Sequence, residues 1–353
     1  MIELIKGDIT YYLETNNSEE ISELFRLADR IRERYVGNKV YLRAIIEFSN
    51  ICRNNCKYCG IRRDANIKRY AMKPKEIVKC AQYAEDLGYG TVVLQSGENS
   101  IYDDKMADIV REIKETTKLA VVLSIGEKTY GQYLEYRIAG ADRYLLKHET
   151  SNPKLFYELT GRNLENRLQC LRWLIDLGYQ VGSGNIVGLP GQTIEDLAND
   201  LLMFKEWDFD MLGIGPFIPC HGTPLENHPP GDPILTLKVI ALARILTKNA
   251  HIPATTAIRT VLGDDKAHLI FRCGANVVMG NVTPLEYRKL YRIYPGKVCN
   301  FKDPESWLND IKEQIREAGL KPSGEVGHSL KRRWRLKTLK LKHNNKNFDL
   351  KKC

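Results

Sequence analysis

The residues with the clearest chemical potential are three cysteines in one short stretch, Cys52, Cys56 and Cys59. A loop that folds back over so few residues can bring all three thiolates to one metal centre. Structural zinc normally takes four protein ligands, and no fourth Cys or His lies nearby in the sequence. A 4Fe–4S cluster also normally takes four thiolates, so three thiolates would leave one iron open to another ligand. The C-x3-C-x2-C spacing therefore predicts a cluster with an open coordination site.

Two other interpretations compete with the cluster. The cysteines could hold zinc together with a distant fourth ligand, such as His221 or Cys299, or they could lie close together by chance. Tyr58 directly precedes the third cysteine, and the whole motif follows the first apolar run of the chain. This combination favours the iron–sulfur interpretation.

Composition limits the protein class. The 353 residues are 43% hydrophobic and 27% charged, as in an ordinary globular protein. No apolar run approaches the roughly 18 residues of a membrane span, and the first residues do not form a secretion signal. We therefore expect a cytoplasmic protein. The nine cysteines are unevenly spaced, which fits a disulfide framework poorly.

The net charge of +9 is concentrated in one place. Residues 331–353 hold ten Lys or Arg and a single acid, whereas the rest of the chain has equal numbers of basic and acidic residues. This pattern predicts a solvated, flexible tail. The alternative is an anion-binding arm for a partner protein or RNA.

Eight short apolar runs alternate with helix-like segments. Most are nearly continuous in hydrophobicity, as expected for strands buried on both faces of a parallel sheet. The runs cover residues 42–48, 91–95, 120–124, 143–147, 180–187, 211–217, 253–258 and 275–279. The helix-like segments include residues 75–87, 104–115, 164–177, 194–205 and 233–247.

Eight strand–helix units over roughly 250 residues match a (β/α)8 TIM-type barrel. A doubly wound sheet also alternates, but it usually carries a Gly-rich turn after its first strand, and none is present here. We therefore expect an α/β protein with a barrel domain over residues 38–330. A helical extension over residues 1–37, with an amphipathic helix from about residue 19 to 36, would precede it, and the basic tail over residues 331–353 would follow.

A barrel places its active site at the carboxyl ends of the strands. Polar and Gly-containing strings follow the predicted strands at those positions. They cover residues 49–60, 96–98, 124–127, 148–150, 188–191, 215–216, 255–256 and 279–281.

The cysteine loop resembles that of the radical S-adenosylmethionine (SAM) superfamily. Further strings are similar to the HydE-type [FeFe]-hydrogenase maturases, in a group that also contains biotin synthase and 3-methylornithine synthase. The resemblance runs from about residue 36 to residue 296 and is carried by residues 41–50, 95–98, 146–153, 187–193, 213–219, 272–277 and 290–297. It implies a barrel enzyme in which SAM chelates the open iron.

The resemblance also implies roles for single residues. Cys52, Cys56 and Cys59 would be the cluster ligands and the catalytic centre. The SAM-binding residues would be Tyr58 near the adenine, Ser96, Gly97 and Glu98 at the methionyl ammonium, Ser124, Glu149 toward the ribose or amine, and Arg167 toward the carboxylate. The substrate cavity would be lined by Lys147, Thr255, Thr256, Met279 and Tyr291.

Each of these roles has a structural alternative. Arg167 could be a helix-surface residue, and Glu149 could cap the following helix. Thr255 and Thr256 could be ordinary strand residues, and Met279 could fill the barrel interior.

The sequence departs from the family pattern at several positions. Some HydE proteins carry three further cysteines for an auxiliary cluster. Here Cys299 stands at the first such position, but Trp307 and Asp310 stand at the others, so we predict one cluster. Lys147 stands where the family often has Arg, which removes a planar fork of donors. Cys220 begins a string that replaces the usual His-Pro-Asp, and it should lie near the mouth.

These observations predict a radical SAM enzyme that acts on a small-molecule or iron-complex substrate during assembly of the hydrogenase active-site cluster. Its expected partners are other hydrogenase maturases and a ferredoxin-type reductant, with no membrane or nucleic-acid partner. The alternatives are a 3-methylornithine synthase-like mutase and, from another class, a noncatalytic iron–sulfur or zinc protein with an RNA-binding tail.

Overall fold

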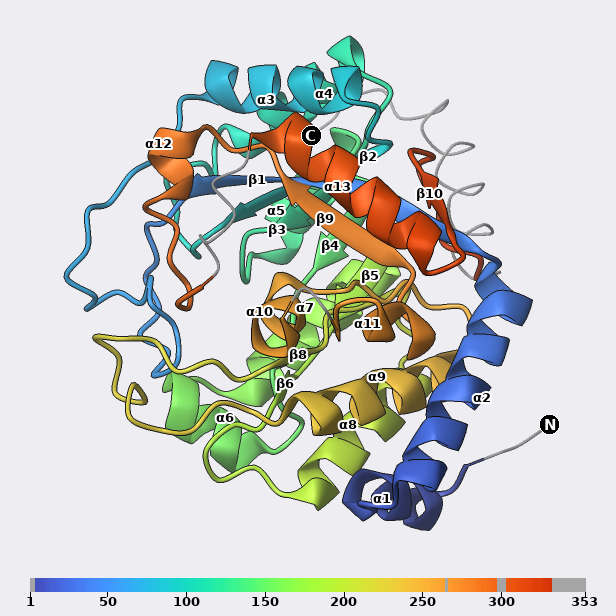
Figure 1. The fold of residues 1–353 in the computed structure, drawn as a ribbon. Helices are drawn as coiled ribbons and strands as arrows, with labels where there is room; N and C mark the ends of the chain where they lie inside the picture. Colours follow the sequence, from blue (N-terminus) through green and yellow to red (C-terminus); the bar gives the residue numbers. More distant parts are fainter. Residues whose placement is uncertain (1–3, 264–265, 297–302, 332–353) are drawn as a thin grey trace.

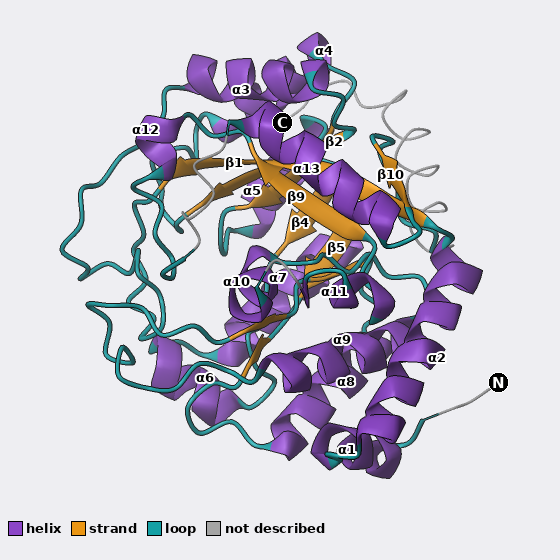
Figure 2. Cartoon of the chain, in the orientation of Figure 1, coloured by secondary structure: helices purple, strands orange, loops and turns teal. Residues whose placement is uncertain are grey.

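A ring of parallel strands surrounded by helices forms the body of the protein in this computed structural model, which describes residues 4–263, 266–296 and 303–331 (Figures 1 and 2). The strands are β1 Lys39–Ser49, β2 Thr91–Ser96, β3 Ala120–Ser124, β4 Arg143–Leu145, β5 Gln180–Ser183, β6 Ile186–Val187, β7 Met211–Leu212, β8 Gly215–Pro216, β9 Val277–Asn281 and β10 Lys321–Ser323. Their positions confirm the α/β barrel that the alternating pattern predicts.

The ring runs through β1, β2, β3, β4, β5 and β7, and β9 pairs with the other side of β1. Its last gap is bridged by two isolated parallel contacts, Met211 with His251 and Pro253 with Val277. Ile45, Val93, Val122 and Met211 pack together as a small cluster of their own. Because they come from four different strands of one ring, they fill its interior.

The seventh strand, predicted over residues 253–258, is wrong for most of its length. Only Pro253 pairs with a neighbour, and helix α10 begins at Thr256 and ends at Leu262. Thr255 explains the change because its hydroxyl accepts a hydrogen bond from the Ile258 N–H and caps the helix.

Two predicted strands, residues 180–187 and 211–217, are each split in two. The reason lies at Gly184, where an added Cβ would stand 2.2 Å from the Gly213 carbonyl oxygen. The chains diverge after this close approach, and β6 and β8 form a separate two-stranded sheet.

Helices cover the outside of the ring (Figure 2). They are α1 Lys6–Glu14, α2 Ser18–Val36, α3 Pro74–Asp86, α4 Met106–Thr116, α5 Tyr130–Ile138, α6 Pro153–Thr160, α7 Leu164–Asp176, α8 Ile194–Glu206, α9 Pro233–Thr247, α10, α11 Leu269–Arg272, α12 Leu285–Arg288 and α13 Pro304–Glu317. The N-terminal pair α1 and α2 packs on α8 and α9, and its buried Leu24 and Ala28 belong to the same core cluster as the barrel strands. Across the described ranges, no helix has the length and hydropathy that a membrane span requires.

The chain returns to the base of the barrel near its C-terminal end. Strand β10 pairs with the start of β1, and the carbonyls of Val326 and Gly327 accept hydrogen bonds from the buried Arg143 guanidinium at 2.9 and 3.0 Å. Lys331, where we expect the basic tail to begin, is itself buried and donates to Asp208. The remainder of that tail, residues 332–353, lies outside the described residues.

Candidate functional site

The cysteine loop leaves the carboxyl end of β1 and lies across the mouth of the barrel, on the left side of Figure 1. Backbone hydrogen bonds fix it on two sides. Arg53 N–H donates to the Glu98 carbonyl at 2.8 Å, and Lys57 N–H donates to the Leu159 carbonyl at 2.8 Å. Arg69 braces the loop from inside because its guanidinium donates to the carbonyls of Asn50 and Ile61. These contacts shape the loop before any ligand binds.

The three loop thiols are free and partly buried. Burial, together with the neighbouring Cys52, raises the pKa of the Cys56 thiol to about 11. Burial also raises the pKa of Cys59, with added effects from Cys56 and Cys52. Cys52 thus acts on both other thiols and Cys56 acts on Cys59, so the three thiols lie close enough to interact. Binding of a metal centre there must release their protons.

Gly97 permits the loop to lie close to the end of β2. A Cβ added at Gly97 would stand 2.4 Å from the Ile51 carbonyl oxygen and 2.8 Å from Cys52 Cβ. No side chain fits at that distance, so the first cysteine can pack against this strand end only if the residue is glycine. Gly97 therefore lies beside the cysteine loop, and its contact with the SAM ammonium stays a prediction.

A network of charged side chains lies next to the thiols. Glu127 accepts hydrogen bonds from Arg167 Nε at 2.6 Å and from Arg162. Arg162 also reaches Glu98, whose other oxygen is 2.8 Å from Arg53 Nη2. Burial acts to raise the pKa of the Glu98 carboxyl, but Arg162, the Glu127 N–H and the other guanidinium groups hold it below the usual value. The Glu98 carboxyl therefore stays ionised although it is buried.

Glu98, which we expect at the ammonium group of SAM, has no free carboxylate oxygen. Both of its carboxylate oxygens already have donors, from Arg53 on one side and from Glu127 N–H and Arg162 on the other. An ammonium group would have to share or replace one of them. Arg167 can still donate a hydrogen bond to a ligand. Its Nε donates to Glu127 and its Nη1 to the Lys147 carbonyl, while Nη2 has no partner in the described part of the chain.

Glu149 is the most strained residue of the site. Its φ of 64° is rare for a residue other than glycine. Its Oε2 is buried without a hydrogen-bond partner, although Lys147 Nζ approaches it to 3.3 Å as an ion pair. Glu149 is therefore not the cap of the following helix, a role that Asn152 performs through its side chain. The carboxylate is free to receive a donor from a ligand.

The other predicted SAM-binding residues also lie at the mouth. Ser96 and Ser124 end the neighbouring strands β2 and β3, and Ser96 Oγ donates to the Gly97 carbonyl. Tyr58 packs against a small apolar cluster that includes Phe217 and Leu189. Burial raises the pKa of its hydroxyl, with further effects from Glu149 and Cys56.

The five predicted substrate residues are only partly brought together. Thr256 and Met279 line an interior cavity of about 300 Å³, whereas Thr255 caps α10 and Lys147 pairs with Glu149. Tyr291 is buried, and its hydroxyl accepts a hydrogen bond from Gln95 Nε2 at 3.2 Å.

The same cavity contains polar groups to which the sequence analysis gave no role. Glu47 points into it from β1 and accepts a hydrogen bond from Asn281 Nδ2 at 2.8 Å. The sequence signal was available, since a carboxylate inside a continuous apolar strand is unusual. Glu127 and Arg162 were also missed.

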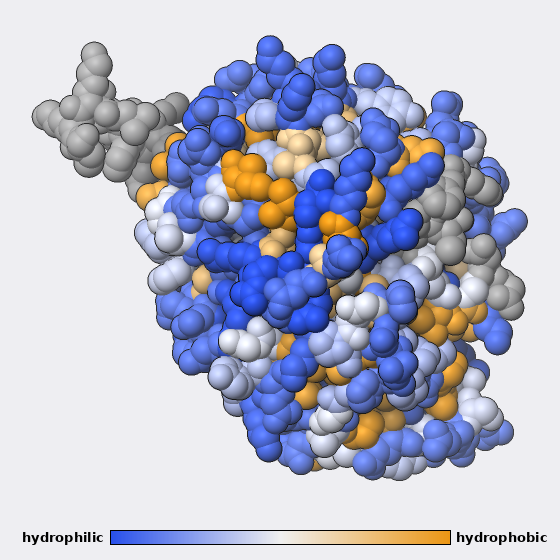
Figure 3. Space-filling model, turned by 90° about the vertical axis from the view of Figure 1, so that its left-hand side faces the viewer, coloured by the Kyte–Doolittle hydropathy of each residue, from blue (hydrophilic) through white to orange (hydrophobic). Residues whose placement is uncertain are grey.

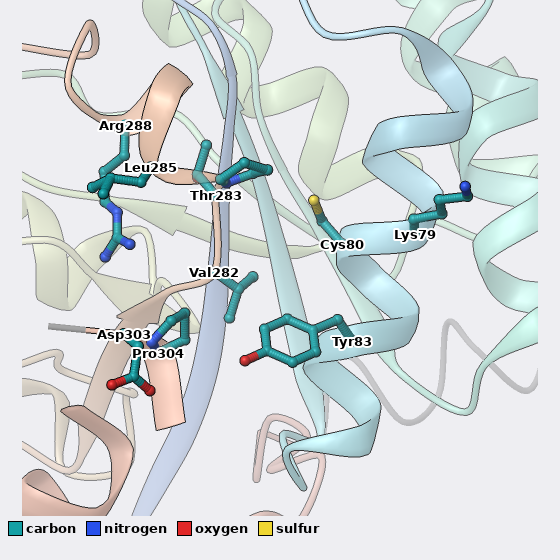
Figure 4. Close-up of a pocket in the computed structure, with 10 residues that line it drawn as sticks. Lys79, Cys80, Tyr83, Val282, Thr283, Leu285, Arg288, Asp303 and Pro304 are labelled. Atoms are coloured by element: carbon teal, nitrogen blue, oxygen red, sulfur yellow. The ribbon is translucent and has the colours of Figure 1, made fainter. Parts of the chain in front are cut away.

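A second hollow lies elsewhere. It has a volume of about 440 Å³ and lies between α3 on one side and residues 282–288 and 303–304 on the other, as Figure 4 shows. Cys80, Tyr83 and Arg288 are among its lining residues. None of the predicted site residues lines it, so the larger hollow is not the candidate active site.

The described residues show no zinc site with a fourth protein ligand. Within the described ranges, no three His, Cys, Asp or Glu side chains converge on a single ion. His221, one proposed fourth ligand, is fully exposed and pairs with Glu226 at 2.9 Å. The other, Cys299, lies outside the described residues.

Cys220 does lie near the mouth, as we expect from its sequence position. Its Sγ would stand 2.6 Å from a Cβ added at Gly60, and it acts on the pKa of Cys59. Glu149 and Arg167 act instead on Cys56. Cys220 therefore lies beside Cys59, whereas Glu149 and Arg167 lie beside Cys56.

Comparison with known proteins agrees with this geometry. The Radical SAM superfamily model matches residues 46–204, and the Biotin and Thiamin Synthesis associated domain matches residues 214–321. The chain is 53% identical over 307 residues to the [FeFe] hydrogenase maturase subunit HydE of Thermotoga maritima, covering 86% of this chain and 88% of that protein. The chain belongs to the radical SAM superfamily, in the HydE group.

More distant radical SAM relatives support the same assignment. The 3-methylornithine synthase of Methanosarcina acetivorans is 29% identical over 92% of both chains. The crystal structure of methylornithine synthase (PylB) superimposes with a TM-score of 0.82 at 27% identity, covering 91% of this chain and 95% of that one. Membership confirms a radical SAM enzyme and excludes the noncatalytic interpretation.

Radical SAM enzymes hold a 4Fe–4S cluster and SAM, and the residues present fit both. Three neighbouring thiols whose charges interact suit a cluster that takes one thiolate on each of three irons. Among the described residues, Glu149 Oε2 is a buried acceptor that receives no hydrogen bond, and Arg167 Nη2 donates none. The methionyl end of SAM carries one ammonium and one carboxylate, which complement Glu149 and Arg167 respectively.

Proposed function

We propose that this enzyme performs adenosyl-radical chemistry on a small iron-bound or sulfur-containing precursor during assembly of the [FeFe]-hydrogenase active-site cluster. The observation that carries the proposal is the 53% identity to HydE over most of both chains. The three free thiols beside an ionised pocket support it, because they are the groups that this chemistry requires.

When bound, the reduced cluster supplies the electron that splits SAM and yields the 5′-deoxyadenosyl radical. The chain's own residues would do the rest. Cys52, Cys56 and Cys59 would ligate the cluster, and Arg167 and Glu149 would orient the charged ends of SAM. The buried walls around them exclude water from a reactive radical.

Glu127 would act through Arg167. Its carboxylate holds Arg167 Nε, and the Lys147 carbonyl holds Nη1, so the guanidinium plane is fixed with Nη2 left over. The interior cavity with Glu47, Thr256 and Met279 would receive the substrate. In this proposal the barrel over residues 38–330 is the catalytic unit.

We propose a single cluster. Trp307 and Asp310 lie on α13 where an auxiliary site would need cysteines, and Trp307 packs against Gly280 instead, where an added Cβ would stand 2.6 Å from its ring. The proposed partners are fellow maturases and a ferredoxin-type reductant. The described cysteines are free thiols, which suits a cytoplasmic location.

One matched pair of variants tests the cluster assignment. Cys56→Ala should lose the iron–sulfur absorbance and the formation of 5′-deoxyadenosine from SAM under dithionite, with the circular dichroism spectrum unchanged. Cys220→Ser should keep both, because Cys220 is not a ligand in this proposal. Loss of the cluster in Cys220→Ser, or zinc alone in anaerobically prepared protein, would contradict the assignment.

A second candidate function is a 3-methylornithine synthase-like mutase, which the fold similarity to methylornithine synthase favours. Offering lysine to the reduced enzyme separates the two. Formation of methylornithine would support the mutase. Activation of an immature [FeFe]-hydrogenase in the presence of its other maturases would support the maturase.

A further inference from the structure

The cluster loop carries a local excess of positive charge. Between Arg53 and Arg69 there are six Lys or Arg and one carboxylate, Asp64, although residues 1–330 as a whole contain equal numbers of basic and acidic groups. Outside the loop, residues 1–330 carry five more acidic than basic groups, so the positive excess belongs to this loop and to the tail, of which residues 332–353 lie outside the described residues. A concentrated positive charge on a chain that is otherwise acidic up to residue 330 indicates a partner of opposite charge.

Hydrogen bonds hold these cations beside the thiols. Arg63 N–H donates to the Asn54 carbonyl at 2.7 Å, and Asn50 Nδ2 donates to the Lys68 carbonyl at 2.8 Å. The returning half of the loop is thus fastened to the residues that flank Cys52. Lys57 lies between the second and third cysteines in the sequence.

Four of the cations are exposed, Arg53, Lys57, Arg63 and Lys68. Arg53 pairs with the buried Glu98, and we call the other three the basic rim. Lys57 and Lys68 make no ion pair within the described ranges, and Arg63 pairs with Asp64 at 2.9 Å. Arg69 is not part of the rim because its donors are used by backbone carbonyls. The face that bears the loop is turned to the viewer in Figure 3, which shows strongly hydrophilic surface gathered near its centre.

We propose that the basic rim is the docking surface for an acidic one-electron donor protein. Splitting SAM reductively requires one external electron for each event, so the donor loses one electron and the enzyme gains it, with no bond or proton transferred between the two proteins. A rim directly over the cluster loop minimises the transfer distance. Complementary charge speeds encounter and fixes orientation. This inference rests on the proposed radical SAM chemistry.

The direct test measures binding rather than turnover. An acidic bacterial ferredoxin is titrated into the holoenzyme at low ionic strength, with wild type compared with the double variant Lys57→Glu/Lys68→Glu. We expect the variant's Kd to rise at least about tenfold, and the difference to shrink in about 0.5 M salt, where the Debye length is only a few ångströms. The matched control is Arg26→Glu/Arg30→Glu on the exposed face of α2, which makes the same change in charge away from the loop. The control should bind ferredoxin as wild type does.

A kinetic measurement separates docking from damage to the cluster. The rim variant should form 5′-deoxyadenosine at the wild-type rate with dithionite and at least about tenfold more slowly with reduced ferredoxin. Unchanged ferredoxin affinity in the rim variant, or an equal loss in the α2 control, would overturn the docking site. An equal loss with both reductants would also overturn it. If wild type cleaved no SAM with dithionite, the proposed function would fail, while the binding titration would still decide the docking surface.

Discussion

The two ends of the barrel bury charge in different ways. At the mouth, Glu127 makes direct ion pairs with Arg162 and Arg167. Glu98 makes direct ion pairs with Arg162 and Arg53. At the base, the fully buried Arg143 makes no direct ion pair within the described residues. It donates instead to Thr91, Gln180 and the two carbonyls of the returning chain.

The difference shows in the pKa values. Burial lowers the pKa of Arg143 to about 10, and burial together with the nearby Arg43 and Arg143 lowers that of His251. At the mouth, burial also opposes the charge of Arg167, but Glu127 and Glu98 raise its pKa. Buried charge at the mouth is therefore stabilised by opposite charges, whereas the buried Arg143 at the base is stabilised by hydrogen bonds to neutral groups. Three changes test this division.

The largest expected effect is at the base. Arg143→Met should lower the free energy of unfolding by about 3 kcal/mol, because several buried hydrogen-bond partners lose their donor together. Urea denaturation measures this loss, and SAM affinity at a temperature where the variant is folded should stay unchanged. Arg111→Met on the exposed face of α4 is the control. Normal stability of Arg143→Met, or weakened SAM binding by the folded variant, would contradict a purely structural role for Arg143.

The next effect is at the mouth. Glu127→Gln should weaken SAM binding about tenfold, or about 1.4 kcal/mol, because Arg167 loses the carboxylate that fixes its plane. Equilibrium dialysis with holoenzyme gives the Kd, and iron content should not change. Glu165→Gln removes a carboxylate from the same region but from an exposed pair with Arg172, and it should have no effect. Equal Kd values for Glu127→Gln and wild type would refute the positioning role.

The smallest effect is a pH dependence at the base. His251 accepts a hydrogen bond from Asn276 through Nδ1 and is neutral, with its pKa well below the usual 6.5. The unfolded chain therefore binds a proton that the folded chain does not, and stability falls as the pH drops below about 6.5. We expect a loss of about 0.7 kcal/mol between pH 7 and pH 6 from this group. His251→Asn should flatten the profile, and a parallel profile for wild type and variant would contradict the assignment.

The sequence predicts local features of this molecule well. Continuous apolar runs locate the barrel strands because both faces of each are buried, and Asp232 with Pro233 marks the start of α9 correctly. The cysteine motif is readable because its three thiols are close in the chain. The prediction of the seventh strand is wrong because Thr255 caps helix α10 within an apolar run.

Features that depend on distant contacts are not readable in this way. Arg162 and Glu127 meet across 35 positions, and Arg162 and Glu98 across 64. Neither spacing has a periodicity that would reveal the pair. The close approach of Gly184 to Gly213 is hidden for the same reason, so each of the two split strands was predicted as one.

The way the chain returns to the base has a consequence for biosynthesis. Residues 321–331 are translated after every strand of the ring, yet β10 pairs with β1 and Arg143 depends on the carbonyls of Val326 and Gly327. A nascent chain that has already formed β1 to β9 therefore still holds a buried guanidinium without its full set of acceptors. The hydrogen bonds at the base of the barrel are therefore complete only after this last described segment has joined them.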